Sequence, residues 1–199
     1  SIRTLVAIAT KLRKVIRSFD LEQCYLQAPI QQPCLLKDGA RLLMYPPREL
    51  ILKDKWGRPC VFQVTSNLYG LASGGADSFT HVDAHMVNEQ QLAASKGDPC
   101  LYTRKTSEGW MYLVVWVDDV IGAGTTPAMV SDFLRDFKYP FSSSGAFEYA
   151  LKINVVQEDG LIKLSQTPYI EAVAAKFGMT DANPKHTPMA SDSTFSKDQ

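Results

Sequence analysis

The sequence predicts an α+β fold built around a mostly antiparallel sheet. Segments with helical and strand periodicity alternate along the chain, and several neighbouring strand segments are separated only by short turns, as in β-hairpins. Length and composition agree with this class. The 199 residues are 45% hydrophobic and 21% charged, which is enough to bury a core without disulfide or metal cross-links.

Composition excludes several classes of protein. The 21 Lys and Arg residues balance 21 Asp and Glu residues, so any contact with nucleic acid must come from local basic patches. The longest apolar run, residues 111–117, is far shorter than the ~20 residues of a membrane-spanning helix, and no secretory leader is recognisable. The cysteines form no C-x-x-C pair, which favours reduced thiols in an intracellular protein. They are Cys24, Cys34, Cys60 and Cys100.

The first half of the chain predicts a helix, a strand, a region of hairpins and a second helix. Apolar residues recur at helical spacing over 2–16, with Ser1 in the N-cap position, and residues 17–22 alternate as a strand. Residues 41–64 contain apolar stretches around turns with Pro and Gly, which indicates a hairpin-rich lobe with an excess of basic side chains. A helix is expected over 76–88.

The second half predicts hairpins and two further helices. Residues 100–104 and 110–117 have the pattern of paired strands, and Thr126 with Pro127 marks the start of a helix that runs to about residue 138. The remaining elements are a strand over 120–123, a loop over 141–147, strands over 149–157 and 161–164, a helix over 167–178 and a disordered tail over 190–199.

Asp118 and Asp119 interrupt the longest apolar run, at the turn of a predicted hairpin. Ionised carboxylates among apolar side chains need a partner, and no Lys or Arg lies within ten residues of the pair in sequence. A divalent cation such as Mg²⁺ fits, because it is held by one or two carboxylates together with substrate phosphates. Asp20, in the strand over 17–22, is the candidate third carboxylate. The alternative is an exposed turn in which Asp is only a good turn former.

Several motifs carry a resemblance to a polymerase family. Residues 116–119 (W-V-D-D) are similar to the Y-V-D-D box of reverse transcriptases, and residues 19–26 are similar to M-D-V-K-T-A-F-L. Residues 66–71 match S-L-Y-G-L, and residues 98–102 match D-P-C-L-Y. Further matches lie at 1–5, 44–47, 164–166, 169–170, 177–179 and 187–189. In this order, over residues 1–189, they resemble the polymerase of copia-type LTR retrotransposons.

The resemblance implies a right-hand polymerase palm with a partial fingers subdomain. The palm would comprise residues 1–36 and 72–166, the fingers hairpins residues 37–71, and the start of the thumb or connection residues 167–189. The implied activity is RNA-directed DNA synthesis, a two-metal nucleotidyl transfer from dNTPs to a primer 3′-OH on an RNA or DNA template. Mg²⁺ is the implied cofactor, and Mn²⁺ would also serve.

The resemblance also implies partners and a location. The partners are the primed template and the remainder of a Pol polyprotein, with its upstream fingers, RNase H and integrase, and no membrane is involved. The location is intracellular, either cytoplasmic in a virus-like particle or nuclear. The alternative function is a catalytically degenerate or domesticated palm that binds nucleic acid or a protein.

Four residues would form the metal site by resemblance. Asp20 and Asp118 would bridge the two ions, Asp119 would be the nearby third carboxylate, and the backbone carbonyl of Leu21 would complete a site. Two ions about 4 Å apart stabilise the attacking and leaving oxygens of an in-line phosphoryl transfer.

Five further residues would contact substrate by resemblance. Tyr25 aligns with the aromatic residue that excludes a 2′-hydroxyl, and Tyr69 and Gly70 would lie beside the incoming nucleotide. Trp116 and Lys152 would lie along the primer strand, where the family has tyrosine and glycine. The family's K-Q-A-P after Y-G-L is A-S-G-G in this chain.

Three other patterns are weaker. Residues 70–75 have the glycine spacing of a P-loop but lack its lysine, and residues 122–127 lack the third glycine of a dinucleotide-binding fingerprint. His81 and His85 are four residues apart on a predicted helix, but the glutamate of H-E-x-x-H is missing. A solvated helix face is the expected setting of these histidines.

Overall fold

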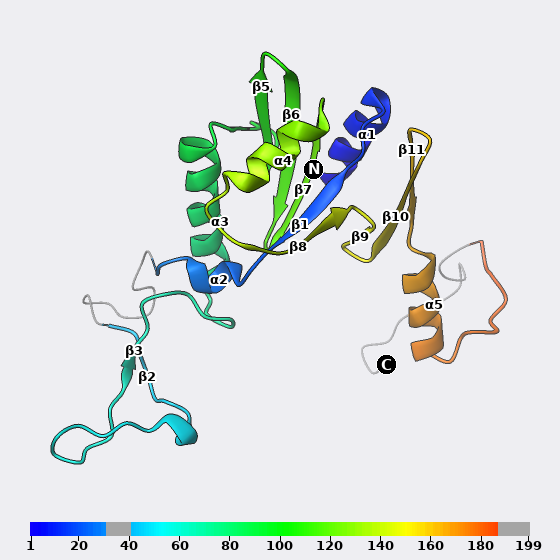
Figure 1. Ribbon diagram of the computed structural model, residues 1–199. Helices are drawn as coiled ribbons and strands as arrows, with labels where there is room; N and C mark the ends of the chain where they lie inside the picture. The colour runs from blue at the N-terminus through cyan, green and yellow to red at the C-terminus, as the bar shows by residue number, and fades with distance from the viewer. Residues whose placement is uncertain (31–40, 187–199) are drawn as a thin grey trace.

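The computed structural model of the chain describes residues 1–30 and 41–186, and it confirms a mixed α/β fold with antiparallel sheets (Figure 1). Three predictions lie outside the described residues: the state of the Cys34 thiol, the family motif at 187–189 and the disordered tail at 190–199. Cys24, Cys60 and Cys100 are free thiols, as expected. No helix within the described ranges is long and apolar enough to cross a membrane.

A six-stranded antiparallel sheet forms the centre of the molecule. Its strands in spatial order are β4 (Ala93–Ala94), β5 (Leu101–Thr106), β6 (Gly109–Trp116), β7 (Asp119–Gly124), β1 (Arg17–Leu21) and β8 (Phe141–Ala146). Strands β5, β6 and β7 are joined by short hairpin turns, whereas β1 enters from the start of the chain and pairs with β7 and β8. Residues far apart in the sequence therefore meet on β1.

Helices cover both faces of this sheet. Helix α3 (Gly74–Ala84), continued by the π-helical turn η2 (His85–Glu89), packs on one face together with α4 (Pro127–Arg135). Leu113 and Val115 of β6 belong to the buried cluster on this face. Helix α1 (Ile2–Leu12) packs on the other face, where Val114 is buried. The alternation along β6 thus places successive side chains in two separate cores.

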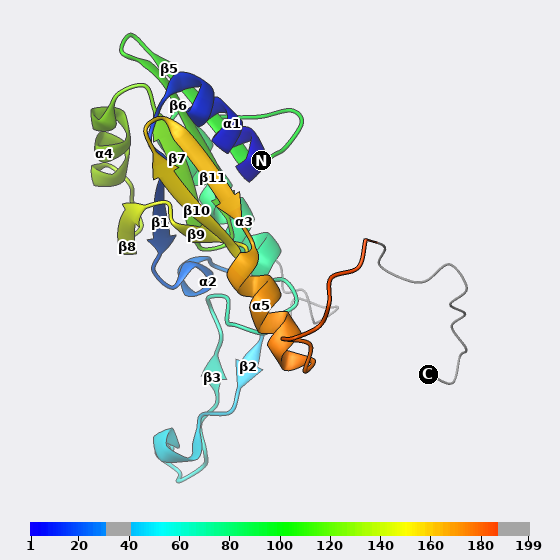
Figure 2. The ribbon, with the colours of Figure 1, turned by 90° about the vertical axis from the view of Figure 1, so that its right-hand side faces the viewer.

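A second, three-stranded sheet lies beside α1 (Figure 2). It consists of β9 (Tyr149–Ala150), β10 (Ile153–Glu158) and β11 (Leu161–Ser165) in the order β11-β10-β9. Ala150 and Val155 join the buried cluster under α1. Helix α5 (Thr167–Lys176) follows, and none of its side chains is buried.

Residues 41–64 form a lobe that projects away from the central sheet in both views (Figures 1 and 2). We call this segment the hairpin lobe. It contains the paired strands β2 (Leu43–Met44) and β3 (Phe62–Gln63) and the short helix η1 (Arg48–Leu50). It has no buried side chain. The short helix α2 (Cys24–Gln27) lies between β1 and the residues that lead to this lobe.

The prediction of a loop over 141–147 was wrong, because residues 141–146 form the edge strand β8. This F-S-S-S-G-A segment has no alternation of apolar and polar residues. Its extended shape comes from pairing with β1, where Phe19 faces Ser144 and Arg17 faces Ala146. Strand formation at such a site depends on the neighbouring strand more than on local propensity.

The predicted start and end of the first helix also need correction. Helix α1 ends at Leu12, since Arg13 adopts a left-handed conformation with φ of 51° and caps the helix. The side chain of Ser1 makes no capping hydrogen bond and instead donates to the carboxylate of Asp98. By contrast, Thr126 caps α4 as predicted, because its hydroxyl accepts a hydrogen bond from the Met129 amide.

The prediction of a solvated helix face for His81 and His85 was wrong. His85 is buried against the rings of Phe137 and Tyr139, and its Nδ1 lies 3.0 Å from a carboxylate oxygen of Glu89. The Tyr139 hydroxyl is 2.8 Å from Nε2 of His81. The two imidazoles therefore belong to the packing between α3 and the segment after α4.

Candidate active site

The candidate site is the place where β1 meets the turn between β6 and β7. Asp20 of β1 is the direct cross-strand partner of Asp119, the first residue of β7. The Leu21 amide donates a 2.7 Å hydrogen bond to the carbonyl oxygen of Asp118, which fixes the turn against β1. Side chains directly opposite each other on antiparallel strands have Cβ atoms ~5 Å apart. The fold therefore brings together the three aspartates that the sequence singles out.

The electrostatics of this cluster are unfavourable in the protein alone. Burial and then the charge of Asp20 raise the pKa of Asp118 above its ordinary value. Burial, followed by the charges of Asp20 and Asp118, raises the pKa of Asp119 as well. None of the ion pairs among the described residues involves these carboxylates. Like charges in facing positions are destabilising, so a bound cation would relieve the repulsion.

The carboxylates are not gathered into a complete ligand set. Across the described ranges, no group of three or more His, Cys, Asp or Glu side chains is arranged to hold a metal ion. One oxygen of Asp20 accepts a hydrogen bond from the Ser142 hydroxyl of β8. What the structure offers is a facing pair, Asp20 and Asp119, beside Asp118. Such a hard oxygen set suits Mg²⁺, which keeps several waters and takes its remaining ligands from phosphates.

The turn that carries Asp118 has an unusual backbone. Val117 and Asp118 connect Trp116 to its cross-strand partner Asp119, and Val117 has a φ of +57°. A β-branched residue in the left-handed region is a clear outlier, and such strain costs of order 1–3 kcal/mol. The surrounding contacts must hold it there. One of them is the thiol of Cys24, 3.6 Å from the Val117 carbonyl oxygen.

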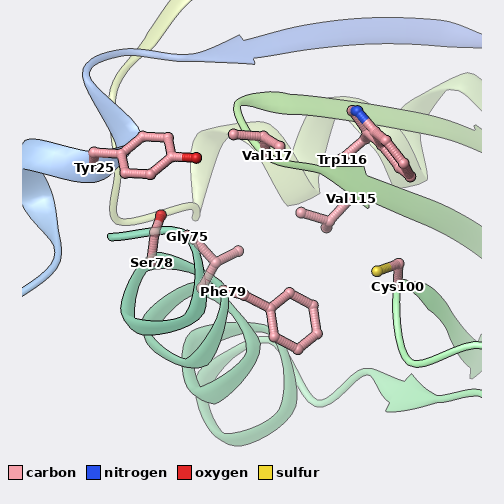
Figure 3. A pocket seen from close by; sticks show the side chains of 9 residues that line it. Tyr25, Gly75, Ser78, Phe79, Cys100, Val115, Trp116 and Val117 are labelled. Atoms are coloured by element: carbon pink, nitrogen blue, oxygen red, sulfur yellow. The ribbon is translucent and has the colours of Figure 1, made fainter. Parts of the chain in front are cut away.

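Tyr25 stands beside this turn and forms one wall of an apolar pocket of about 200 Å³ (Figure 3). Val117 and Val115 line the pocket from the sheet, and Phe79 lines it from α3. A Cβ atom on Gly74 would lie 3.0 Å from the Tyr25 ring, so the start of α3 packs closely against this ring. The apolar lining does not suit a phosphate group, and it suits a sugar ring or another apolar surface.

Tyr69 faces Tyr25, with ring centroids 5.2 Å apart. Desolvation and then the charge of Asp118 raise the pKa of the Tyr69 hydroxyl, which links this exposed side chain to the aspartate cluster. The adjacent Gly70 has a φ of +96°, a conformation that favours glycine. Tyr25 and Tyr69 therefore lie side by side, with Gly70 next to Tyr69 in the chain.

The loop before Tyr69 is held by a buried polar pair that sequence reasoning missed. Asn67 is fully buried, and its amide nitrogen lies 3.2 Å from a carboxylate oxygen of Asp77 in α3. The same nitrogen donates to the carbonyls of Ala28 and Pro29, both at 3.3 Å. This network ties the loop to the end of α2 and the first turns of α3.

The two residues expected along a primer strand lie in different places. Trp116 is the last residue of β6, 48% exposed, and pairs with Asp119. Lys152 is in the turn between β9 and β10 with a φ of 61°, and its ammonium lies 4.7 Å from the ring centre of Tyr169. Trp116 thus adjoins the carboxylates directly, whereas Lys152 belongs to the second sheet.

The contacts that Ser142 and Cys24 make at this site are not apparent from the sequence. Ser142 lies in the segment expected to be a loop, and it contacts Asp20 only because that segment is β8. Cys24 is buried beneath the turn, where its sulfur is 3.0 Å from the Ser78 hydroxyl. Burial is the main cause that raises the pKa of its thiol, so it stays protonated. Ser142 belongs to no charge pattern or motif, and the motif that contains Cys24 gives no sign of its contact with the turn.

Comparison with known proteins identifies one family model and several transposon proteins that the chain resembles. The family model described as reverse transcriptase (RNA-dependent DNA polymerase) matches residues 1–191. The chain is 26% identical over 202 residues to the retrovirus-related Pol polyprotein from transposon TNT 1-94 of Nicotiana tabacum, covering 99% of the chain. It is 26% identical over 192 residues to the Pol polyprotein from transposon RE1 of Arabidopsis thaliana, covering 96%. A putative transposon Ty5-1 protein of Saccharomyces cerevisiae is 22% identical over 173 residues and 85% of the chain.

The family model covers nearly the whole chain, so the chain belongs to the reverse transcriptase family. Within that family it is of the copia type, as its similarity to transposon Pol polyproteins shows. The chain spans only 14% of the tobacco polyprotein and 12% of the RE1 polyprotein.

Proposed function

We propose that residues 1–186 include the palm of an RNA-directed DNA polymerase and that Asp20, Asp118 and Asp119 are its catalytic carboxylates. One observation carries the proposal: Asp20 faces Asp119 across β1 and β7, next to Asp118, with no positive side chain paired to them in the described part of the chain. In this proposal the hairpin lobe belongs to the fingers, and α5 begins the thumb or connection.

The residues present fit Mg²⁺, with Mn²⁺ as a substitute, because all the charged groups are hard oxygen donors. Asp20 and Asp118 would hold the ions, with Asp119 beside them and the Leu21 carbonyl as a further oxygen ligand. When bound, the metal ions supply charge neutralisation for the attacking and leaving oxygens of the phosphoryl transfer. Asp20 and Asp119 lie on paired strands and Asp118 lies in the adjoining turn, which would help to set their positions before substrate binds.

The remaining residues would position the nucleotide and the primer. Tyr25 and Tyr69 form an aromatic surface beside the aspartates, and we propose that the sugar of an incoming dNTP packs on Tyr25, which would leave no room for a 2′-hydroxyl. Gly70, with open space around it, would let the backbone approach the nucleotide. Trp116 would contact the primer end, and Lys152 would contact the strand further away.

The experiment is primer extension by the 199-residue chain, on an RNA and on a DNA template with Mg²⁺ or Mn²⁺, together with Mn²⁺ titration by calorimetry. We expect Asp118→Asn to lower extension at least ~10²-fold and to weaken Mn²⁺ binding, because it removes charge stabilisation at the reacting centre. Asp159→Asn is the matched control, since Asp159 is also an acidic hairpin-turn residue, between β10 and β11. Equal extension by the parent and Asp118→Asn would overturn the assignment.

A second candidate function is nucleic-acid or protein binding without catalysis. It is favoured by the incomplete ligand set across the described ranges and by the hydrogen bond that Ser142 donates to Asp20. Under this alternative the chain binds a primed template but shows neither extension nor Mn²⁺ uptake. In either case we propose that it acts with the remainder of a Pol polyprotein, in cytoplasmic virus-like particles or in the nucleus.

A further inference from the structure

The end of the hairpin lobe carries a rigid turn that the proposed catalytic function does not use. We call residues 54–58 the lobe tip. One carboxylate oxygen of Asp54 accepts hydrogen bonds from the amides of Trp56 and Arg58, at 2.9 and 3.0 Å. The other accepts a 2.8 Å hydrogen bond from Nε of Arg58. Gly57, with a φ of +79°, closes the turn by donating to the Asp54 carbonyl at 2.9 Å.

This turn displays an indole ring with two cationic side chains beside it. Trp56 is 67% exposed. The Lys55 ammonium lies 4.3 Å from its ring centre, and the Arg58 guanidinium carbon lies 4.8 Å from it. The hairpin lobe has no buried side chain, so Trp56 serves no core. A single exposed apolar residue needs no explanation, but here a carboxylate fixes the backbone that presents the ring.

The net positive charge of the hairpin lobe favours a partner with negative charge. Residues 41–64 contain five basic residues and two acidic ones, which gives 5 − 2 = +3, while the whole chain is neutral. The basic residues are Arg41, Arg48, Lys53, Lys55 and Arg58. One of the two acids, Asp54, is paired with Arg58 at 2.8 Å. The surface around Trp56 is therefore locally basic, although the overall composition shows no such bias.

A basic surface with an exposed aromatic ring matches one class of ligand closely. Proteins hold single-stranded nucleic acid by stacking bases on aromatic side chains while basic groups follow the phosphates. Arginine beside the ring adds a second flat, cationic surface. Duplex nucleic acid offers no free base faces along its length, so a stacking site selects unpaired nucleotides.

We propose that the lobe tip is a binding platform for unpaired nucleotides, in which a base stacks on the Trp56 indole and Lys55 and Arg58 contact the neighbouring phosphates. The inference rests on the proposed function only in taking nucleic acid as the partner, and it holds whether or not the aspartates are catalytic. The lobe projects away from the central sheet (Figure 1). The platform would therefore engage a single-stranded stretch away from the site of synthesis.

The test measures binding of a fluorescent single-stranded oligothymidylate to the whole chain by anisotropy at several salt concentrations. Trp56→Ala is expected to weaken binding about tenfold, and Trp56→Phe should restore most of it because a phenyl ring still stacks. Lys55→Ala is expected to reduce the slope of log affinity against log salt by about 0.7, the value for one phosphate contact in a single strand. Trp110→Ala is the matched control, since Trp110 is also an exposed indole, 41% exposed, with Lys105 5.3 Å from its ring centre.

The controls separate this inference from the catalytic one. Asp118→Asn should bind the oligonucleotide like the parent, and Trp56→Ala should bind Mn²⁺ like the parent. Affinity for a blunt duplex should be unchanged by Trp56→Ala. The inference fails if Trp56→Ala leaves single-strand affinity intact, if Trp110→Ala lowers it equally, or if duplex affinity falls by the same factor. It also fails if Trp56→Ala instead abolishes self-association measured by ultracentrifugation, which would make the tip a protein contact.

Discussion

The central sheet and the hairpin lobe are stabilised in different ways. In the sheet, side chains on both faces are buried under helices, and Leu113 and Val114 have no exposed surface at all. The hairpin lobe buries no side chain, and its best-defined part is a turn held by hydrogen bonds to Asp54. Burial of apolar area is the main source of folding free energy. The sheet must therefore set the stability of the chain, while the lobe contributes little to it.

The sharpest test of this comparison replaces one large aromatic residue in each region. Phe133 of α4 is 1% exposed, whereas Tyr45 of the hairpin lobe is 82% exposed. We expect Phe133→Ala to lower the free energy of unfolding by about 3–5 kcal/mol, because it leaves a cavity in the core. Tyr45→Ala should change it by no more than about 0.5 kcal/mol. Urea unfolding followed by circular dichroism measures both, and comparable losses would contradict the contrast.

Adding atoms to the sheet should also be costly. A Cβ atom on Gly122 of β7 would lie 2.3 Å from a methyl carbon of Leu113 on β6. We expect Gly122→Ala to lower the free energy of unfolding by about 1–3 kcal/mol through overpacking. Gly145→Ala on the edge strand β8 is the control, since its Cβ would meet nothing within 4 Å. Thermal unfolding measures both variants, and equal losses of stability would contradict tight packing at the centre of the sheet.

A smaller change in the free energy of unfolding is expected at the aspartates, where like charges repel each other in the sheet. Because the pKa values of Asp118 and Asp119 are raised in the folded chain, the folded state holds their protons more tightly than the unfolded state. Their contribution to stability is therefore present below the ordinary Asp pKa of about 3.9 and is lost as pH rises through the raised values.

Without divalent metal, Asp119→Asn should thus stabilise the chain at neutral pH by about 0.2–1 kcal/mol, the range for facing like charges. The gain should shrink as the medium is acidified below the raised pKa values. Thermal unfolding at several pH values measures it, with Asp159→Asn as the control that should show no such trend. A destabilised Asp119→Asn chain at neutral pH would mean that the carboxylate is already compensated by the protein.

The sequence was most informative where structure is local. The strands around residues 101–124 are apolar runs separated by short turns, and Thr126-Pro127 is a local helix-start signal, so the sequence predicts both. The long-range contacts of Asp20 and of the turn beside it are harder to predict from sequence. Ser142 lies 122 residues from Asp20 in sequence, and Cys24 lies 93 residues from the Val117 carbonyl that it contacts.

Such contacts arise from strand order, which periodicity does not reveal. The segment at 141–146 is an edge strand, and its sequence has no apolar pattern that would predict this. The buried Asn67–Asp77 pair resembles any loop and helix surface in sequence. The aspartates themselves were found because charge inside an apolar run is rare enough to need an explanation.

The left-handed backbone at Val117 sets two demands on this position against each other. Glycine or asparagine would relax the left-handed conformation at this position, so backbone energetics alone favours replacing the valine. The valine side chain, however, forms part of the pocket wall opposite Tyr25. Val117→Gly would therefore relax the turn and, at the same time, open the pocket beside Tyr25.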